Sequence, residues 1–298
     1  MKNKTIFIIA GPTAVGKTSV AVQLAQHLQT KIISADSRQC FKELNIGAAK
    51  PSALELQSVH HYFINSHSIH ENVNAVIFEQ LSLQWADEIF QQNDTAVMIG
   101  GTGLYLKAFC EGMDEMPAVD PSIRKKIQEQ FEENGIGWLQ EEMKISDPEY
   151  YRSGEMLNPQ RMMRALEVKL GTGASIQSFK SKQKKTRAFS IKKIGLQLPK
   201  EQLHQHINAR VDDMISKGLL EEAIQLRPYK SLNALQTVGY TEFFEYMEGK
   251  ISFAEATEKI KKNTRHYAKR QMTWFRKDES IHWIAPDDLR QLKKITEC

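Results

Sequence analysis

Eight residues near the N-terminus have the types and spacing of a phosphate-binding loop. They read Gly11-Pro12-Thr13-Ala14-Val15-Gly16-Lys17-Thr18 and fit the pattern G-x-x-x-x-G-K-[ST]. In this pattern, backbone N–H groups of the loop and of the following helix point at phosphate oxygens, and the lysine adds a positive charge. A hydroxyl at the position of Thr18 is a ligand for Mg²⁺ beside the phosphate. The motif predicts a bound diphosphate, but it does not say which reaction the diphosphate enters.

Two further polar residues, Asp36 and Thr102, follow apolar runs in the same part of the chain. A carboxylate at position 36 can bind Mg²⁺ or accept a proton from a nucleophile, although aspartate is also a common turn residue. Thr102 lies between glycines that let the backbone approach a ligand, and its hydroxyl can donate a hydrogen bond to a phosphate or bridging oxygen. No Walker-B aspartate ends the run before Thr102, which disfavours an NTP-hydrolysing motor or switch.

The elements that must position these residues follow an α/β pattern. Apolar runs predict strands at residues 5–10, 31–35 and 95–99, and helical periodicity predicts helices after the glycine loop and at 78–91. Alternating strands and helices form a parallel, doubly wound sheet, which binds ligands at the carboxyl ends of its strands. We therefore expect the glycine loop, Asp36 and Thr102 to meet in one crevice.

The pattern changes after about Gly112. Charged helical segments are predicted at 124–134, 138–143 and 159–170, and the next strand is predicted at 190–198. The predicted architecture is therefore α/β: a P-loop NTPase-like, doubly wound parallel sheet core interrupted by a mainly helical insertion domain. The core with its C-terminal helices would comprise residues 1–112 and 191–298, and the insertion residues 113–190.

Composition and charge limit the class of partner. The chain has 298 residues, of which 41% are hydrophobic and 26% charged, and its net charge is +4. Two runs, 180–193 and 259–277, are rich in Lys and Arg and contain no acidic residue, which favours a phosphate-rich partner. No apolar run approaches the length of a membrane span, and the first apolar stretch enters the glycine loop directly. We expect a cytoplasmic protein without a membrane partner.

Further segments give the chain a resemblance to the tRNA dimethylallyltransferases (tRNA isopentenyltransferases), in their bacterial form. The resemblance covers nearly the whole chain, with departures at Phe41, at Ala48 and after His61. The matching segments, beside the glycine loop, are Asp36-Ser37-Arg38-Gln39, Asn45-Ile46-Gly47-Ala48-Ala49-Lys50-Pro51, His60-His61, Gly100-Gly101-Thr102-Gly103-Leu104-Tyr105, Asn158-Pro159-Gln160-Arg161, Val238-Gly239-Tyr240 and Thr264-Arg265-His266-Tyr267-Ala268-Lys269-Arg270-Gln271-Met272-Thr273-Trp274-Phe275.

The resemblance implies transfer of a dimethylallyl group from its diphosphate to N6 of the adenosine next to the anticodon on the 3′ side, with release of diphosphate. The glycine loop, residues Gly11, Pro12, Thr13, Ala14, Val15, Gly16, Lys17 and Thr18, would then hold the leaving group and not ATP. Asp36 would act as the general base. Lys17, Mg²⁺ at Thr18, Thr102 and Arg210 would stabilise the charge on the departing oxygen.

The resemblance also implies contacts with the anticodon arm of tRNA, whose target base must leave its stack. On sequence alone, Gln160, Arg161 and Arg164 are equally well explained as a polar helix face. We expect a monomer whose partners are tRNA and dimethylallyl diphosphate. The implied tRNA contacts are Asp36, Ser37, Arg38, Gln39, Thr102, Arg124, Gln160, Arg161, Met162, Met163, Arg164, Gln236, Gly239, Tyr240, Lys269, Arg270, Gln271 and Arg276.

Other classes of protein stay open from the residues alone. An ATP-dependent phosphotransferase would use the glycine loop but would leave the two basic runs unexplained. An isopentenyltransferase that acts on free adenine nucleotides would not need the insertion or the basic C-terminal helix. A non-catalytic RNA-binding NTPase switch would need the missing Walker-B acid.

Overall fold

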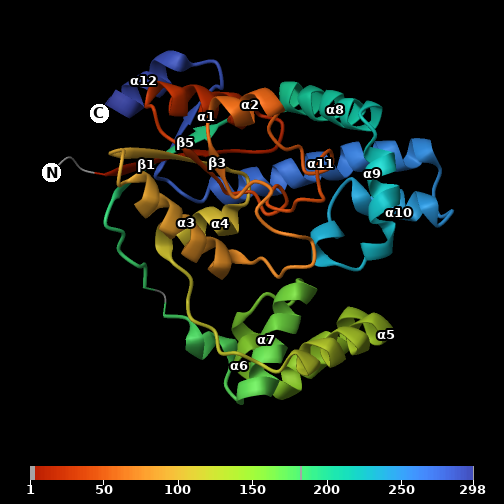
Figure 1. Cartoon of the computed structure of the whole chain (residues 1–298). Coiled ribbons are helices and arrows are strands. Elements are labelled where there is room, and N and C mark those ends of the chain that lie inside the picture. The colour runs from red at the N-terminus through yellow and green to blue at the C-terminus, as the bar shows by residue number, and fades with distance from the viewer. Residues whose placement is uncertain (1–3, 182, 298) are drawn as a thin grey trace. The chain divides into compact units, whose positions relative to one another are not determined.

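The computed structural model describes residues 4–181 and 183–297. The chain forms two compact units (Figure 1). The core unit comprises Met1–Gly112 and Lys185–Cys298, and the insertion unit comprises Met113–Lys184. Lys182 of the first basic run lies outside the described residues.

The core unit is built on a six-stranded sheet in which every neighbouring pair is parallel. The order is β3-β2-β4-β1-β5-β6, so β1, which leads into the glycine loop, lies between β4 and β5. The predicted α/β class with a parallel sheet is confirmed. The strands are β1 Thr5–Ala10, β2 Ile32–Ser34, β3 His61–Tyr62, β4 Thr95–Gly100, β5 Ser190–Leu196 and β6 Ile281–Ile284.

Helices cover both faces of the sheet (Figure 1). One face buries its apolar side chains against α1, α8, α11 and α12, as in the cluster of Ile9, Leu24, Ile207 and Leu292. The other face packs against α3, which in turn packs against α4. The helices of the core unit are α1 Lys17–His27, α2 Ala53–Ser58, α3 Ala75–Ile89, α4 Gly103–Glu111, α8 Lys200–Ser216, α9 Leu219–Leu226, α10 Tyr240–Met247, α11 Phe253–Phe275 and α12 Leu289–Glu297. Two 3₁₀ turns, Arg227–Tyr229 and Asn233–Leu235, join α9 to α10.

The insertion unit is helical, as its sequence predicts. Its elements are α5 Pro121–Ser146, α6 Pro148–Ser153, α7 Pro159–Thr172 and a 3₁₀ turn at Ile176–Phe179. Each helix starts with an Asp or Asn whose side chain accepts a backbone hydrogen bond, followed directly by Pro. This pairing satisfies an N–H group of the first turn and fixes φ at the first helical position. The two predicted helices at 124–134 and 138–143 form one element, α5, broken at Gly135, where φ is 72°.

The chain returns to the core before the strand that sequence reasoning took as the boundary. The backbone N–H of Lys185 donates to the carbonyl of Glu111 at 2.8 Å. Arg187 donates to Oε1 of Glu79 at 2.9 Å and also to the carbonyls of Ala108 and Phe109 at the end of α4. Arg187 and Glu79 are both nearly buried. Arg187, a member of the first basic run, is therefore a structural residue of the core and not part of a nucleic-acid surface.

Candidate active site

The strand ends that carry the glycine loop, Asp36 and Gly101 meet in one cavity of about 540 Å³, as the parallel sheet predicts. We call it the first cavity. Its lining includes Lys17 and Thr18 from the start of α1 and Asp36 from the end of β2. Helix α1 begins at Lys17 without any side-chain cap. The N–H groups of its first turn are therefore available to an anion.

Lys17 lies deep in the first cavity. Its Nζ donates to the carbonyl of Pro12 at 2.6 Å. Burial, with a smaller contribution from the positive charge of Arg210, lowers the pKa of Lys17 to about 7, and the negative charge of Asp36 only partly opposes this. Burial also lowers the pKa of Arg210. Two partly buried cations beside one carboxylate leave an excess of positive charge that a diphosphate would neutralise.

Two side chains from distant helices hold the glycine loop. Arg210 of α8 donates to Oγ1 of Thr13 at 3.2 Å. Gln271 of α11 accepts a hydrogen bond from the N–H of Thr13 at 2.8 Å and donates to the carbonyl of Gly101 at 2.9 Å. Gln271 is buried, and its oxygen and nitrogen are both bonded inside the core. The implied contact between Gln271 and tRNA is therefore not supported, because this residue braces the loop.

Asp36 uses only one of its two carboxylate oxygens in the turn that it begins. Its Oδ1 accepts from the N–H groups of Arg38 at 2.9 Å and Gln39 at 3.3 Å. Among the described residues, no hydrogen bond reaches its Oδ2. The turn role and the functional role that the sequence left open are thus compatible. The turn fixes the carboxylate, and Oδ2 is free to accept a proton.

Thr102 faces Asp36's neighbour, Ser37. The N–H of Ser37 donates to Oγ1 of Thr102 at 3.1 Å, and the two hydroxyl oxygens are 3.5 Å apart. The glycines on either side of Thr102 have a different role from the one predicted. A Cβ at Gly101 would lie 2.3 Å from Nε2 of Gln271, and a Cβ at Gly103 would lie 2.2 Å from Cδ1 of Trp274. They make room for side chains of α11 and not for a ligand.

A second cavity, of about 510 Å³, adjoins the first. Both cavities are lined by Thr13, Asp36, Ala48, Ala49, Arg210 and Tyr267. The wall of the second cavity combines apolar side chains with arginines. The apolar residues are Val211, Met214, Leu219, Val238 and Ile260, and the arginines are Arg38, Arg210 and Arg270. An apolar wall with a few cationic groups suits a base joined to a phosphate chain. Asp36 lies where the two cavities meet.

Tyr267 is a residue of both cavities that the sequence-based site omitted. Burial, together with the nearby charge of Asp36, raises its pKa to about 12. It lies on α11 one turn before Gln271, on the same face of the helix. That spacing from a motif residue was the signal that could have found it.

The implied tRNA contacts of the core unit separate into three groups. Ser37, Arg38, Gln236, Gly239 and Arg270 line the second cavity, and Gln39 lines the first. Lys269 and Arg276 are exposed on α11 and line neither cavity. Thr102 lines neither cavity either, so the prediction that it meets Asp36 in the crevice is not confirmed.

Tyr240 forms the third group. It is fully buried, and its hydroxyl donates to Oε1 of Glu222 at 2.6 Å. The implied contact of the Tyr240 side chain with tRNA is therefore wrong.

In the insertion unit, the implied contacts also differ among themselves. Met162 and Met163 are buried in the apolar core of the unit, beside Leu139 and Leu166, so their side chains do not face a partner. Around Glu167, Arg124 and Arg164 form ion pairs with the carboxylate, and Arg124 donates to Gln160 at 2.9 Å. Arg161 pairs with Glu155. These groups form a polar cluster on α5 and α7.

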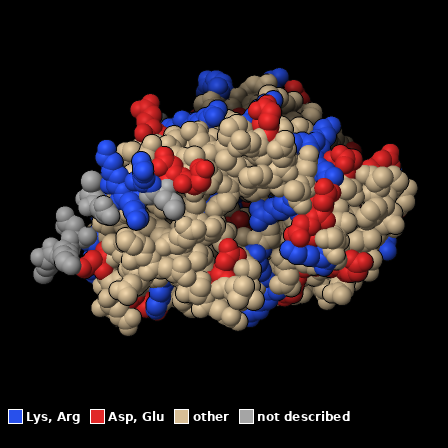
Figure 2. Space-filling view, turned by 90° about the horizontal axis from the view of Figure 1, so that it is seen from above, with Lys and Arg blue, Asp and Glu red and all other residues tan. Residues whose placement is uncertain are grey.

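Charge on the surface is mixed. In the view of Figure 2, Lys and Arg side chains are interspersed with Asp and Glu side chains and do not form one continuous basic surface. Part of the basic run on α11 is paired, since Lys261 contacts Asp212 and Lys259 contacts Glu245. A nucleic acid would therefore be held by individual basic side chains and not by a positive potential that extends over the whole surface.

The donor atoms of the first cavity fit Mg²⁺. Among the described residues, no three His, Cys, Asp or Glu side chains are grouped so that they could hold a metal. Mg²⁺ needs no such group, because one or two protein oxygens and the phosphates of a substrate commonly complete its shell together with water. Thr18 and Asp36 both line the cavity and offer such oxygens. The described chain also contains no helix with the length and apolarity to cross a membrane.

Comparison with known proteins gives consistent matches over almost the whole chain. Residues 39–278 match the family model described as IPP transferase. A tRNA dimethylallyltransferase of Christiangramia forsetii is 48% identical over 288 residues, which are 97% of this chain and 95% of the relative. One of Cytophaga hutchinsonii is 43% identical over 296 residues, which are 99% of this chain and 97% of the relative.

Solved structures agree. The tRNA isopentenylpyrophosphate transferase of Bacillus halodurans superposes with a TM-score of 0.71 at 32% identity, covering 99% of this chain and 94% of that one. A eukaryotic dimethylallyltransferase described as acting on tRNA superposes with a TM-score of 0.79 at 26% identity, covering 99% of this chain and 77% of that one.

Proposed function

Because the chain belongs to the IPP transferase family, we propose that its two adjoining cavities hold the two substrates of one prenyl transfer. The protein is an enzyme that modifies tRNA by transferring a dimethylallyl group to N6 of the adenosine next to the anticodon. In the proposal, the first cavity binds dimethylallyl diphosphate and the second receives the adenosine. The reacting atoms then meet beside Asp36, the carboxylate that lines both cavities.

The first cavity suits a diphosphate leaving group. Lys17 and Arg210 carry the positive charge there, and the uncapped start of α1 supplies N–H donors. Negative charge on the bridging oxygen increases as the allylic C–O bond breaks, so groups fixed around that oxygen stabilise the transition state more than the ground state. Thr18, and Asp36 if it shares the ion, would hold Mg²⁺, which supplies further neutralisation of the diphosphate charge.

Asp36 is the proposed base. The lone pair of adenine N6 is delocalised into the ring, so the amine attacks carbon only as its proton is removed. The N6–C bond forms, the C–O bond breaks with its electron pair passing to the diphosphate, and the N6 proton passes to Oδ2 of Asp36. The turn through Oδ1 holds the carboxylate during this step. Proton transfer to a positioned base contributes about 10²- to 10⁴-fold to a rate.

The second cavity and the insertion unit would divide the recognition of tRNA. Ser37, Arg38 and Arg270 lie in the wall of the second cavity and would contact the extruded nucleotide and its phosphates. Arg124, Gln160, Arg161 and Arg164 of the insertion unit, with Lys269 and Arg276 of α11, would hold the flanking anticodon arm. We also propose that the enzyme works in the cytoplasm as a monomer.

The observation that supports this proposal best is the position of Asp36 in both cavities. To test it, the protein is incubated with labelled dimethylallyl diphosphate, Mg²⁺ and unmodified tRNA, with AMP and ATP as comparison substrates. We expect label in tRNA at the adenosine beside the anticodon and none in AMP. Label in AMP but not in tRNA, or consumption of ATP without prenylation, would contradict the proposal.

A further inference from the structure

Two loops form much of the wall of the second cavity. Residues 45–49 contribute Gly47, Ala48 and Ala49, and residues 236–241 contribute all but Tyr240. We call these segments the 45–49 loop and the 236–241 loop. Most of their residues lie outside helices and strands. Contacts from elsewhere must therefore hold the loops in place if the cavity is to keep its shape.

Glu222 of α9 holds the 45–49 loop through its backbone. Its Oε2 accepts from the N–H groups of Asn45 at 3.0 Å and Ile46 at 2.8 Å. Its Oε1 accepts from the N–H of Gly47 at 2.9 Å and from the hydroxyl of Tyr240 at 2.6 Å. Three successive backbone donors converge on one side chain that is distant in sequence. The carboxylate thus fixes the conformation and the position of this loop.

Gly47 and Tyr240 lock the two loops together. A Cβ at Gly47 would lie 2.5 Å from both Cζ and the hydroxyl oxygen of Tyr240. Only glycine lets the 45–49 loop pack flat against the buried ring. Burial raises the pKa of Tyr240, and the negative charge of Glu222 raises it further, so the hydroxyl stays protonated and continues to donate to Glu222.

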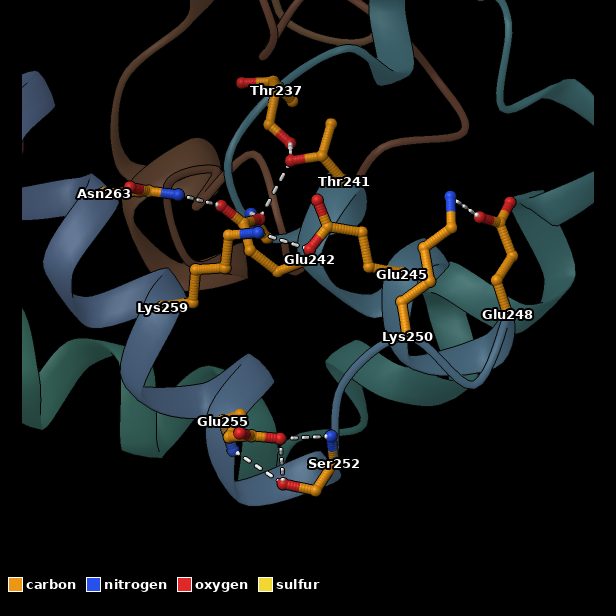
Figure 3. Close-up of polar contacts among 11 residues, drawn as sticks. Thr237, Thr241, Glu242, Glu245, Glu248, Lys250, Ser252, Glu255, Lys259 and Asn263 are labelled. Atoms are coloured by element: carbon orange, nitrogen blue, oxygen red, sulfur yellow. Dashed lines mark hydrogen bonds and ion pairs between the residues drawn. The ribbon is translucent and has the colours of Figure 1, made fainter.

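Glu242 of α10 holds the 236–241 loop in a similar way (Figure 3). It is buried, with 1% of its surface exposed. Its Oε2 accepts from the N–H of Gly239 at 2.8 Å and from the hydroxyl of Thr241 at 3.0 Å. Its Oε1 accepts from the side-chain amide of Asn263 at 2.6 Å. Thr237, Gly239, Thr241, Glu242 and Asn263 all line the second cavity.

Neither carboxylate is used in an ion pair. Within the part of the chain that the structure describes, no Lys or Arg lies within ion-pair distance of Glu222 or Glu242. Two other glutamates, Glu245 of α10 and Glu248 directly after this helix, do form ion pairs. Glu245 pairs with Lys259, and Glu248 pairs with Lys230 and Lys250 at the surface (Figure 3). A carboxylate that is surrounded by fixed N–H and O–H donors organises those donors instead of balancing a charge.

We propose that Glu222 and Glu242 are positioning residues for the acceptor nucleotide. They touch neither reacting atom and act by fixing the two loops that shape the second cavity. Tyr240 joins the two systems because it follows Gly239 in the chain and donates to Glu222. The inference rests on the proposed function, in which the second cavity receives the adenosine of tRNA.

The same Glu→Gln substitution should have different effects at Glu222 and Glu242, because the groups that donate to the two carboxylates differ. In Glu222→Gln, one of the two carboxylate oxygens becomes an NH₂ group, and either orientation places it against a backbone N–H that cannot turn. In Glu242→Gln, the amide oxygen can still face Gly239. The new NH₂ then faces Asn263, whose side-chain amide can turn over and present its oxygen. Glu222→Gln therefore breaks the arrangement, whereas Glu242→Gln preserves it.

The experiment measures three quantities for each variant: kcat and KM for tRNA, the Kd for tRNA, and the Kd for inorganic diphosphate. For Glu222→Gln we expect kcat/KM for tRNA to fall about ten- to a hundredfold, the loss typical of a substrate misplaced by a fraction of an ångström to 1 Å. Its Kd for inorganic diphosphate should stay within about twofold of the parent, because Lys17, Arg210 and the N–H groups at the start of α1 lie outside both loops. Glu242→Gln should resemble the parent, and Glu242→Met, which removes all three acceptor contacts, should resemble Glu222→Gln.

Glu248→Gln is the matched control, because it removes a carboxylate directly after α10 that is paired only at the surface. If Glu222→Gln does not fold, Tyr240→Phe removes one donor and keeps the ring against Gly47, and it should show a smaller change in the same direction. Parent-like values for Glu222→Gln, equal losses in both Gln variants, or a parallel loss of diphosphate affinity would overturn the inference. Absence of prenyl transfer by the parent would instead contradict the proposed function, and the two dissociation constants would still test the inference.

Discussion

The two cavities are built by different means. The first cavity is framed by the ends of β1, β2 and β4 and by the start of α1. Lys17 belongs to one contiguous motif there, and α8 adds Arg210. The second is framed by two loops that carboxylates from α9 and α10 hold. A phosphate site can be encoded locally because its ligand is recognised by backbone N–H groups. A nucleotide site needs contacts between segments that are distant in sequence.

The largest expected effect lies at the junction of the cavities. Asp36→Asn keeps an oxygen for the turn with Arg38 and Gln39 but removes the basic oxygen. We expect kcat to fall about 10²- to 10⁴-fold, while the Kd values for tRNA and for inorganic diphosphate change little. Single-turnover transfer with saturating substrates measures the chemical step. Asp212→Asn, which changes an exposed partner of Lys261, serves as the control. Loss of diphosphate binding in Asp36→Asn would assign Asp36 to the first cavity alone.

A second test concerns charge in the first cavity. Arg210→Met removes the cation that donates to Thr13 and that, in the proposal, faces the diphosphate. We expect a loss of about 10²- to 10³-fold in kcat/KM for dimethylallyl diphosphate, similar to the loss of one fixed donor to a developing oxyanion. Arg210→Lys should retain part of the activity. If Arg210→Met impaired only tRNA binding, Arg210 would act for the second cavity, whose wall it also shares.

A third test uses pH. The pKa of Lys17 in the free enzyme is about 7, and a bound diphosphate raises it by adding negative charge. Below pH 7 the lysine is protonated in both states, so affinity for dimethylallyl diphosphate should be flat with respect to this group. Above pH 7, binding takes up a proton, and the Kd should rise by up to about tenfold per pH unit.

Titration calorimetry in buffers of different ionisation enthalpy measures this proton uptake. In Arg210→Met the rise should begin at higher pH, because the charge of Arg210 is one cause of the lowered pKa of Lys17. A Kd for dimethylallyl diphosphate that is independent of pH between 7 and 9 would contradict this account of Lys17.

The smallest effect is expected at Gln271, which holds the glycine loop of the first cavity. Gln271→Met removes the acceptor for the N–H of Thr13 and the donor to Gly101. An unmet hydrogen bond of this kind costs about 1–3 kcal/mol, so we expect the Kd for inorganic diphosphate to rise at least about fivefold and the Kd for tRNA to stay constant. A raised Kd for tRNA, with an unchanged Kd for inorganic diphosphate, would restore Gln271 to the tRNA contacts.

The sequence predicted what contiguous patterns encode. The glycine loop, the strand ends at Asp36 and Thr102, the parallel sheet and the helical character of the insertion follow from local rules of spacing and turn chemistry. Motif membership did not separate exposed residues from buried ones. Tyr240, Met162 and Met163 were assigned to tRNA, although they pack inside the protein.

Glu222 and Glu242 were missed for the opposite reason. An isolated glutamate on a predicted helix is ordinarily a solvated residue. Only the fold brings the 45–49 loop against α9, and only then does the carboxylate of Glu222 meet three backbone donors. Tyr267 shows an intermediate case, since its helical spacing from Gln271 contained usable information.

The hydrogen bond from Lys185 to Glu111 has a consequence for how this chain can change in length. The chain leaves the core unit and re-enters it at adjacent points. Arg187 anchors the re-entering segment through its hydrogen bonds to Glu79 and to the end of α4. The entropic cost of closing an inserted segment grows only with the logarithm of its length, by about 0.6 kcal/mol of free energy for each doubling. A longer or shorter insertion unit therefore costs the folding of the core unit little, so its length can change without a large loss of stability in the core unit.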